Sequence, residues 1–88
     1  MRNDLNYPNE LKLKLFNHLK IQPPKVYDGH PVKEVKSQDG VKIILDDDSW
    51  LLFRLSGTEP ILRIYSEATS QALAESLVKQ GKELAFSL

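Results

Sequence analysis

The segment from Arg54 to Arg63, with the sequence RLSGTEPILR, holds the residues of this chain that are best suited to bind an anion. Ser56 and Thr58 supply hydroxyl donors on either side of Gly57, whose missing side chain lets backbone N–H groups approach a ligand. Consecutive N–H groups in a turn form anion-binding concavities, and a guanidinium fork matches the oxygens of a phosphate. The spacing predicts a phosphate-binding loop, with a plain hairpin loop as the alternative.

Two predicted strands on either side of this loop must position the arginines. Over Trp50–Leu55, the alternation of a strand sends Arg54 to the face opposite that of Phe53. If the aliphatic and aromatic side chains of both strands face the helices, Arg63 of Ile61–Glu67 emerges on the same face as Arg54. The two arginines are therefore expected to flank a five-residue loop on one side of the sheet.

Glu59 and Pro60 are assigned to supporting the loop. A carboxylate repels phosphate, so Glu59 is expected to pair with an arginine and hold it in position. Pro60 restricts its own φ angle and thereby sets the exit of the loop.

The elements predicted around the loop form an α+β domain. The order α-β-β-β-β-α favours a four-stranded, mainly antiparallel sheet with the helices packed on one face. Residues 1–7 are expected to be a flexible N-terminus, and residues 8–88 the folded domain. The remaining predicted elements are a helix from Glu10 to Leu19 with Pro8 opening it, an irregular connector from Ile21 to Pro31, a strand at Val32–Ser37 with a bulge or an edge position, a hairpin turn at Asp39 and Gly40, a strand at Val41–Leu45, and a final helix capped by Thr69 or Ser70.

Other residues with metal-binding chemistry are interpreted as surface groups. Asp46, Asp47 and Asp48 are consecutive, and adjacent aspartates in a short turn seldom converge on one ion, which favours a solvated turn. His18 and His30 have no cysteine and no nearby histidine partner. The sequence therefore predicts no metal site and no catalytic residue in this chain.

Composition limits the remaining function classes. The chain has 88 residues, with 12 Lys and Arg balanced by 12 Asp and Glu, which argues against nucleic-acid and membrane-surface binding. It has no cysteine, so disulfides, thiolate metal sites and a cysteine nucleophile are excluded. No apolar run approaches the ~20 residues that cross a bilayer, and the N-terminus lacks the apolar stretch of a signal peptide. We expect a single cytoplasmic domain.

The chemistry-bearing segment also resembles a known family. RLSGTEPILR, with DGVKIILDDDSWLLF before it and IYSEA after it, is similar to the C-terminal, fourth domain of the α-D-phosphohexomutases, which include phosphoglucomutase and phosphomannomutase. The similarity extends over about residues 32–86. This chain has Leu55 where the family usually has proline, and Asp48 where the hairpin often has glycine.

The resemblance implies a fold, a site and a role. It implies a TATA-box-binding-protein-like domain whose phosphate contacts are Arg54, Ser56, Gly57, Thr58 and Arg63, with Glu59 supporting the loop. It also implies a larger enzyme that interconverts hexose 1-phosphates and 6-phosphates, with a phosphoserine and Mg²⁺ on other domains and no cofactor in this chain. The partners would then be a phosphosugar and the other domains. The alternative is a stand-alone binding or regulatory module of the same fold that contacts protein or nucleic acid, although the balanced charge counts against nucleic acid.

Overall fold

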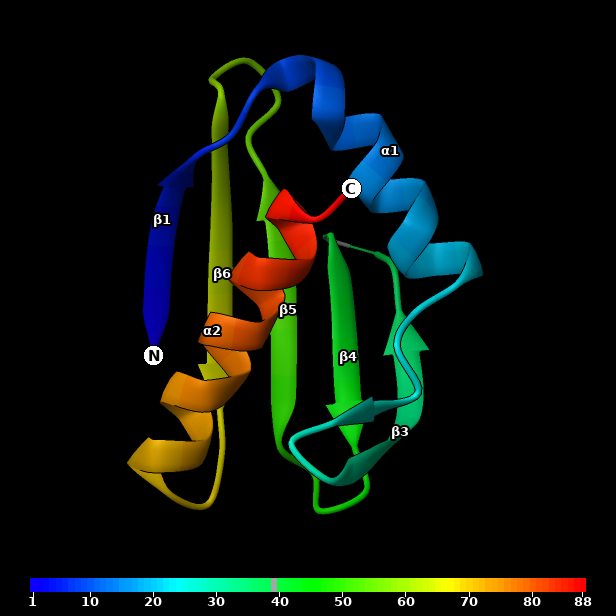
Figure 1. Ribbon diagram of the computed structural model, residues 1–88, viewed down its shortest axis with the longest axis vertical. Helices are drawn as coiled ribbons and strands as arrows, with labels where there is room; N and C mark the ends of the chain where they lie inside the picture. The colour runs from blue at the N-terminus through cyan, green and yellow to red at the C-terminus, as the bar shows by residue number, and fades with distance from the viewer. Residues whose placement is uncertain (39) are drawn as a thin grey trace.

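Alternating apolar residues build the central strands of a six-stranded antiparallel sheet, which two helices cover on one face (Figure 1). The computed structural model describes residues 1–38 and 40–88. Its elements, in chain order, are β1 (Arg2–Asn6), α1 (Asn9–Ile21), β2 (Val26–Tyr27), β3 (His30–Lys36), β4 (Val41–Leu45), β5 (Trp50–Leu55), β6 (Ile61–Glu67) and α2 (Gln71–Phe86). The strands lie in the order β1-β6-β5-β4-β3-β2, and all neighbours are antiparallel.

The core lies between the sheet and the helices. Helix α2 packs on β6 and β5, and α1 contacts β4. This arrangement confirms the predicted α+β class with the helices on one face. We call the opposite, helix-free face of the sheet the open face. The most deeply buried apolar side chains of the core are Leu15, Leu19, Val41, Ile43, Leu45, Leu51, Phe53, Leu62, Ile64, Leu77, Val78 and Ala85.

The prediction of four strands is wrong, first because the N-terminal residues form an edge strand. Strand β1 pairs with β6, with Arg2 opposite Tyr65 and Asn6 opposite Ile61. Within β1 only Leu5 is buried, so the segment lacks the apolar alternation that identifies a strand. Residues Arg2–Asn6 therefore lie at the edge of the sheet, paired through their backbone with β6.

The second additional strand lies in the predicted connector. Strand β2 forms a hairpin with β3 through Asp28 and Gly29, whose φ angles are 51° and 81°. Positive φ at both central residues is the signature of a two-residue type I′ turn, for which Asp-Gly is a preferred pair. Strand β3 accordingly begins at His30. Its pairing with β4 shifts register between Val32 and Glu34, which agrees with the first of the two predicted alternatives, a bulge or an edge position.

Glycine or an unusual backbone angle marks the next two turns. The predicted hairpin residue Asp39 lies outside the described residues, whereas Gly40 has a φ of 99° and an added Cβ there would lie 2.2 Å from the Phe53 carbonyl oxygen. No other residue type fits this position without moving the backbone. In the β4–β5 turn, Asp48 has a φ of 68°, where the family resemblance suggests glycine.

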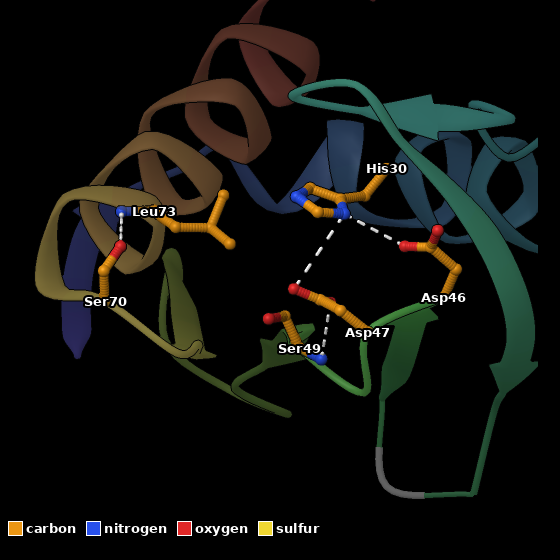
Figure 2. Close-up of polar contacts among 6 residues, drawn as sticks. All are labelled: His30, Asp46, Asp47, Ser49, Ser70 and Leu73. Carbon is orange, nitrogen blue, oxygen red and sulfur yellow. Dashed lines mark hydrogen bonds and ion pairs between the residues drawn. The ribbon is translucent and has the colours of Figure 1, made fainter.

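Both predicted helices are confirmed. Helix α1 follows Pro8, and the Ser70 hydroxyl caps α2 by accepting a hydrogen bond from the Leu73 N–H at 3.1 Å (Figure 2). Neither helix in the described part of the chain combines the length and apolar character that spanning a bilayer demands.

Candidate phosphate-binding site

Arg54 and Arg63 lie directly opposite each other on β5 and β6, and both emerge on the open face. The predicted placement of the two arginines on one face is confirmed. Arg54 is exposed and the Arg63 side chain is 33% exposed, so both guanidinium groups are accessible from solvent. Like charges in directly opposite cross-strand positions destabilise a sheet. The pair contributes nothing favourable to folding by itself, whereas an anion bound to both groups would relieve their repulsion.

Strand β1 gives Arg63 an acidic neighbour that sequence reasoning missed. Asp4 is the cross-strand partner of Arg63, and its Oδ2 lies 3.8 Å from the arginine Nε. The same carboxylate is held more closely by Arg2, at 2.8 Å. The Arg2 hydrogen bond, with smaller contributions from the charges of Arg2 and Arg63, lowers the pKa of Asp4. The expected pairing of Glu59 with an arginine is absent among the residues 1–38 and 40–88, where Asp4 takes that position.

The loop Ser56–Pro60 is closed by its own polar groups. The Ser56 Oγ accepts a hydrogen bond from the Glu59 N–H at 3.2 Å, which leaves the hydroxyl proton available for a ligand. The Ile61 N–H donates to the Glu59 carbonyl oxygen at 2.7 Å. Within the described residues, the N–H groups of Gly57 and Thr58 donate to no protein acceptor. Two neighbouring donors therefore remain available at the tip of the loop.

Gly57 itself has no role in the fold that would require glycine. Its φ is not positive, and an added Cβ would meet no atom within 4 Å. Close approach of a ligand to the backbone is the remaining physical reason for a glycine at this position.

Two residues from the N-terminal part of the chain anchor the loop, and sequence reasoning identified neither. The Tyr7 N–H donates to the Pro60 carbonyl oxygen at 2.8 Å. The Lys12 ammonium donates to the Ser56 carbonyl oxygen at 2.7 Å and also to that of Glu59. Figure 1 shows the β5–β6 connection at the top of the sheet, beside the beginning of α1. No local pattern signals these contacts, because 44 residues separate Lys12 from Ser56.

The resulting arrangement can bind a phosphate but does not enclose it. All predicted contact residues lie within one loop or on the strand positions that flank it, and they supply guanidinium, hydroxyl and backbone N–H donors. Gly57, Thr58, Glu59 and Pro60 are all exposed. The loop is therefore a one-sided surface that leaves a bound phosphosugar open to solvent. The predicted contact residues are Arg54, Ser56, Gly57, Thr58 and Arg63, and the predicted supporting residues are Glu59 and Pro60.

A second polar cluster lies at the opposite end of the sheet. The His30 Nδ1 is 3.0 Å from the Asp46 Oδ1 and 3.9 Å from the Asp47 Oδ2 (Figure 2). These three side chains are close enough to share a metal ion, with ligand atoms within 4.8 Å of one another, a convergence that the sequence did not reveal. Each carboxylate already has a protein partner. Asp46 contacts His30, and Asp47 accepts a hydrogen bond from the Ser49 N–H at 3.0 Å, which lowers the pKa of Asp47. We interpret the cluster as a structural contact that connects the β4–β5 turn to the start of β3.

The three consecutive aspartates do not all converge. Asp48 instead forms an exposed ion pair with Lys33 at 2.6 Å, so that Asp46 and Asp47 are the two aspartates of the run that lie near His30. His18, on α1, is not part of the cluster.

Comparison with known proteins adds an independent observation. Residues 14–83 match the family model described as phosphoglucomutase/phosphomannomutase, C-terminal domain. A probable phosphoglucosamine mutase of Pyrococcus horikoshii is 38% identical over 88 residues, which is 100% of this chain and 19% of that protein. A phosphoglucomutase/phosphomannomutase of Thermococcus kodakarensis is 49% identical over 51 residues, or 58% of this chain and 11% of that protein. The chain therefore spans about a fifth, or less, of the length of these relatives.

Proposed function

The chain belongs to the phosphoglucomutase/phosphomannomutase family as its C-terminal domain, and we propose that its Ser56–Pro60 loop binds the phosphate group of a phosphosugar. The observation that carries this proposal is the direct opposition of Arg54 and Arg63 beside two N–H donors that have no protein acceptor. A phosphate provides the acceptors for all of these groups at once.

Like-charge opposition alone would not single out this site. Lys36 and Lys42 are also cross-strand partners on β3 and β4, and the Lys42 ammonium lies 4.4 Å from the centre of the Trp50 ring. A lysine side chain carries a flexible, strongly hydrated point charge, whereas guanidinium groups present planar forks suited to phosphate oxygens. Of these two pairs, it is the arginine pair that adjoins the Ser56–Pro60 loop with its free N–H donors.

The place of the domain in a larger enzyme is part of the same proposal. The parent protein would interconvert hexose 1-phosphates and 6-phosphates, and this loop would hold the phosphate that is not being transferred. The phosphoserine and Mg²⁺ implied by the resemblance would be supplied by other domains. Phosphoryl transfer needs those groups, so we expect the 88-residue chain alone to show no mutase activity.

Titration of the 88-residue chain with inorganic phosphate and with glucose 6-phosphate, followed by amide NMR at constant ionic strength, tests the proposal. We expect the resonances of Gly57 and Thr58 to shift most and to saturate with a Kd on the order of 1 mM, which corresponds to about −4 kcal/mol. The affinity is low because the loop is open and salt screens its charges.

Variants of the two like-charged pairs provide the matched comparison. Arg54→Ala should weaken binding at least tenfold, since a hydrogen bond to a charged group contributes roughly 1.5–3 kcal/mol. Lys36→Ala removes one charge from the lysine pair on the same face and should leave binding within twofold. Shifts that scatter over surface lysines, or equal losses in both variants, would contradict the proposed site.

A further inference from the structure

The contact of Lys12 with the loop points to a role beyond anchoring. Lys12 is the fourth residue of α1, near the positive end of the helix dipole, where a cation is unfavourable. Its ammonium nevertheless contacts two backbone carbonyl oxygens of the loop, those of Ser56 and Glu59. These acceptors use two of its three N–H donors. The lysine therefore interacts with the backbone of the loop, which fixes the direction of its peptide groups.

The direction of one peptide group is decisive for anion binding. In a trans peptide the carbonyl oxygen and the N–H of the next residue point in opposite directions, and the described chain contains no cis peptide bond. Because the Ser56 carbonyl oxygen points toward Lys12, the Gly57 N–H points away from it. If this peptide rotated, a carbonyl oxygen would replace the N–H donor and repel an anion. Glycine at position 57 makes such a rotation easy, so an external restraint is needed.

We propose that Lys12 is a positioning residue that keeps the Gly57 N–H directed toward the bound phosphate by holding the Ser56 carbonyl oxygen on the opposite side. This inference rests on the proposed function of the loop. Lys12 does not need to touch the ligand. Its effect on phosphate affinity comes from the orientation of the Ser56–Gly57 peptide group, in addition to its positive charge. It lies outside the residues 14–83 that match the family model.

The test compares Lys12→Met and Lys12→Arg with wild type, and uses Lys14→Met as the matched control. Methionine and lysine have similar helix propensities, so α1 should be retained. Lys14 is exposed on the same helix, and two residues of rotation, about 200°, place it on another side. Binding of inorganic phosphate is measured by amide NMR of the 88-residue chain. Lys12→Leu, which also lacks a hydrogen-bond donor and keeps a high helix propensity, serves in place of the methionine variant if that variant does not fold.

We expect Lys12→Met to raise the Kd for phosphate about tenfold, Lys12→Arg to recover most of the affinity, and Lys14→Met to stay within twofold. Salt separates geometry from charge, because the Debye length is about 3 Å at 1 M and a purely electrostatic effect would vanish there. A positioning effect predicts that the ratio of the two Kd values persists at 1 M NaCl. Loss of the ratio in high salt, or equal losses in the Lys12 and Lys14 variants, would overturn the proposal.

The same spectra separate failure of this inference from failure of the proposed function. Without phosphate, Lys12→Met should still shift the Gly57 amide resonance, because the peptide group loses its restraint. If wild type shows no binding at the loop, the proposed function fails. If wild type binds phosphate but Lys12→Met binds equally well, the loop is a site and the positioning role of Lys12 is wrong.

Discussion

Replacing Gly57 with alanine should separate folding from binding at the loop. An added Cβ would meet no atom within 4 Å, and the φ angle is not positive, so the folded state accepts alanine without strain. Under these conditions a Gly→Ala change stabilises a protein by roughly 0.4–1 kcal/mol, because alanine reduces the entropy of the unfolded chain. For a domain of this size, that gain raises Tm by about 2–8 °C.

Phosphate binding should change in the opposite direction. The methyl group would occupy space beside the N–H groups that we propose as donors, and would prevent a phosphate oxygen from approaching them. Losing one hydrogen bond to a charged ligand costs roughly 1.5–3 kcal/mol, so the Kd should rise at least tenfold. Thermal unfolding and amide NMR titration with inorganic phosphate measure the two effects on the same sample.

Gly40→Ala is the contrasting control, because it should be strongly destabilising. At Gly40 the φ angle is 99° and an added Cβ would lie 2.2 Å from the Phe53 carbonyl oxygen. A left-handed φ alone costs an alanine about 1–2 kcal/mol, and the backbone contact adds to this. If Gly57→Ala also destabilised the chain, or left phosphate affinity within twofold, the reasoning about the open loop would be refuted.

Other individual contacts can also be tested by mutation. In the full-length parent enzyme, Arg63→Ala should lower kcat/KM by ten- to a hundredfold or more, since ~1.36 kcal/mol is tenfold in rate. It should leave stability within about 0.5 kcal/mol of wild type because a like-charge repulsion is removed; unfolding of the variant would make Arg63 structural. Asp48→Gly should raise the free energy of unfolding by about 0.5 kcal/mol in urea denaturation, because its φ is 68° and the Lys33 ion pair that it loses is exposed. A decrease would show that the ion pair outweighs the backbone strain. Tyr27→Phe should stabilise the chain by about 1 kcal/mol, since the buried Tyr27 hydroxyl has no hydrogen-bond partner among the described residues. Destabilisation would instead reveal a partner such as a buried water. Burial raises the pKa of the Tyr27 hydroxyl, so ionisation above pH ~10 should destabilise the fold, and the phenylalanine variant should lack this effect in alkaline unfolding curves. The lowered pKa values of Asp4 and Asp47 mean that their stabilising contribution is complete above the unfolded-state value of ~3.9 and is lost as pH falls through the lower folded-state values. The double Asn variant should show a flatter acid-unfolding slope, and an unchanged slope would mean that neither carboxylate matters.

Local sequence patterns predicted the central part of the fold because its strands are half buried. Strands β4, β5 and β6 alternate between the core and the open face, so spacing alone placed Arg54 and Arg63 on one side of the sheet. The Asp28-Gly29 turn carried an equally clear hairpin signal, but the neighbouring prolines directed the interpretation toward an irregular connector. That error was avoidable, since strand β2 needs only two residues to pair with β3.

Strand β1 could not have been predicted from its own residues. The segment RNDLN is polar, and it becomes a strand because β6 offers an unpaired edge about sixty residues later in the chain. The same long-range pairing brings Asp4 to Arg63, and the following residues bring Tyr7 and Lys12 to the loop. The residues that we propose to bind a phosphate could be predicted from a short motif, whereas the residues that contact the motif from elsewhere in the chain depend on tertiary structure.

Several features of the Ser56–Pro60 loop and of the residues around it do not stabilise the fold. The arginine pair is repulsive, the N–H groups of Gly57 and Thr58 have no acceptor among the described residues, and Lys12 opposes a helix dipole. Local rules of stability are usually broken where a protein binds or reacts, because the ligand provides the missing interaction. Strain alone does not mark such a site: Asp48 also has an unfavourable backbone angle, yet its charge is paired with Lys33. At the loop, several unfavourable features coincide, and one phosphate would satisfy the arginines and the free N–H groups together while making use of the orientation that Lys12 imposes.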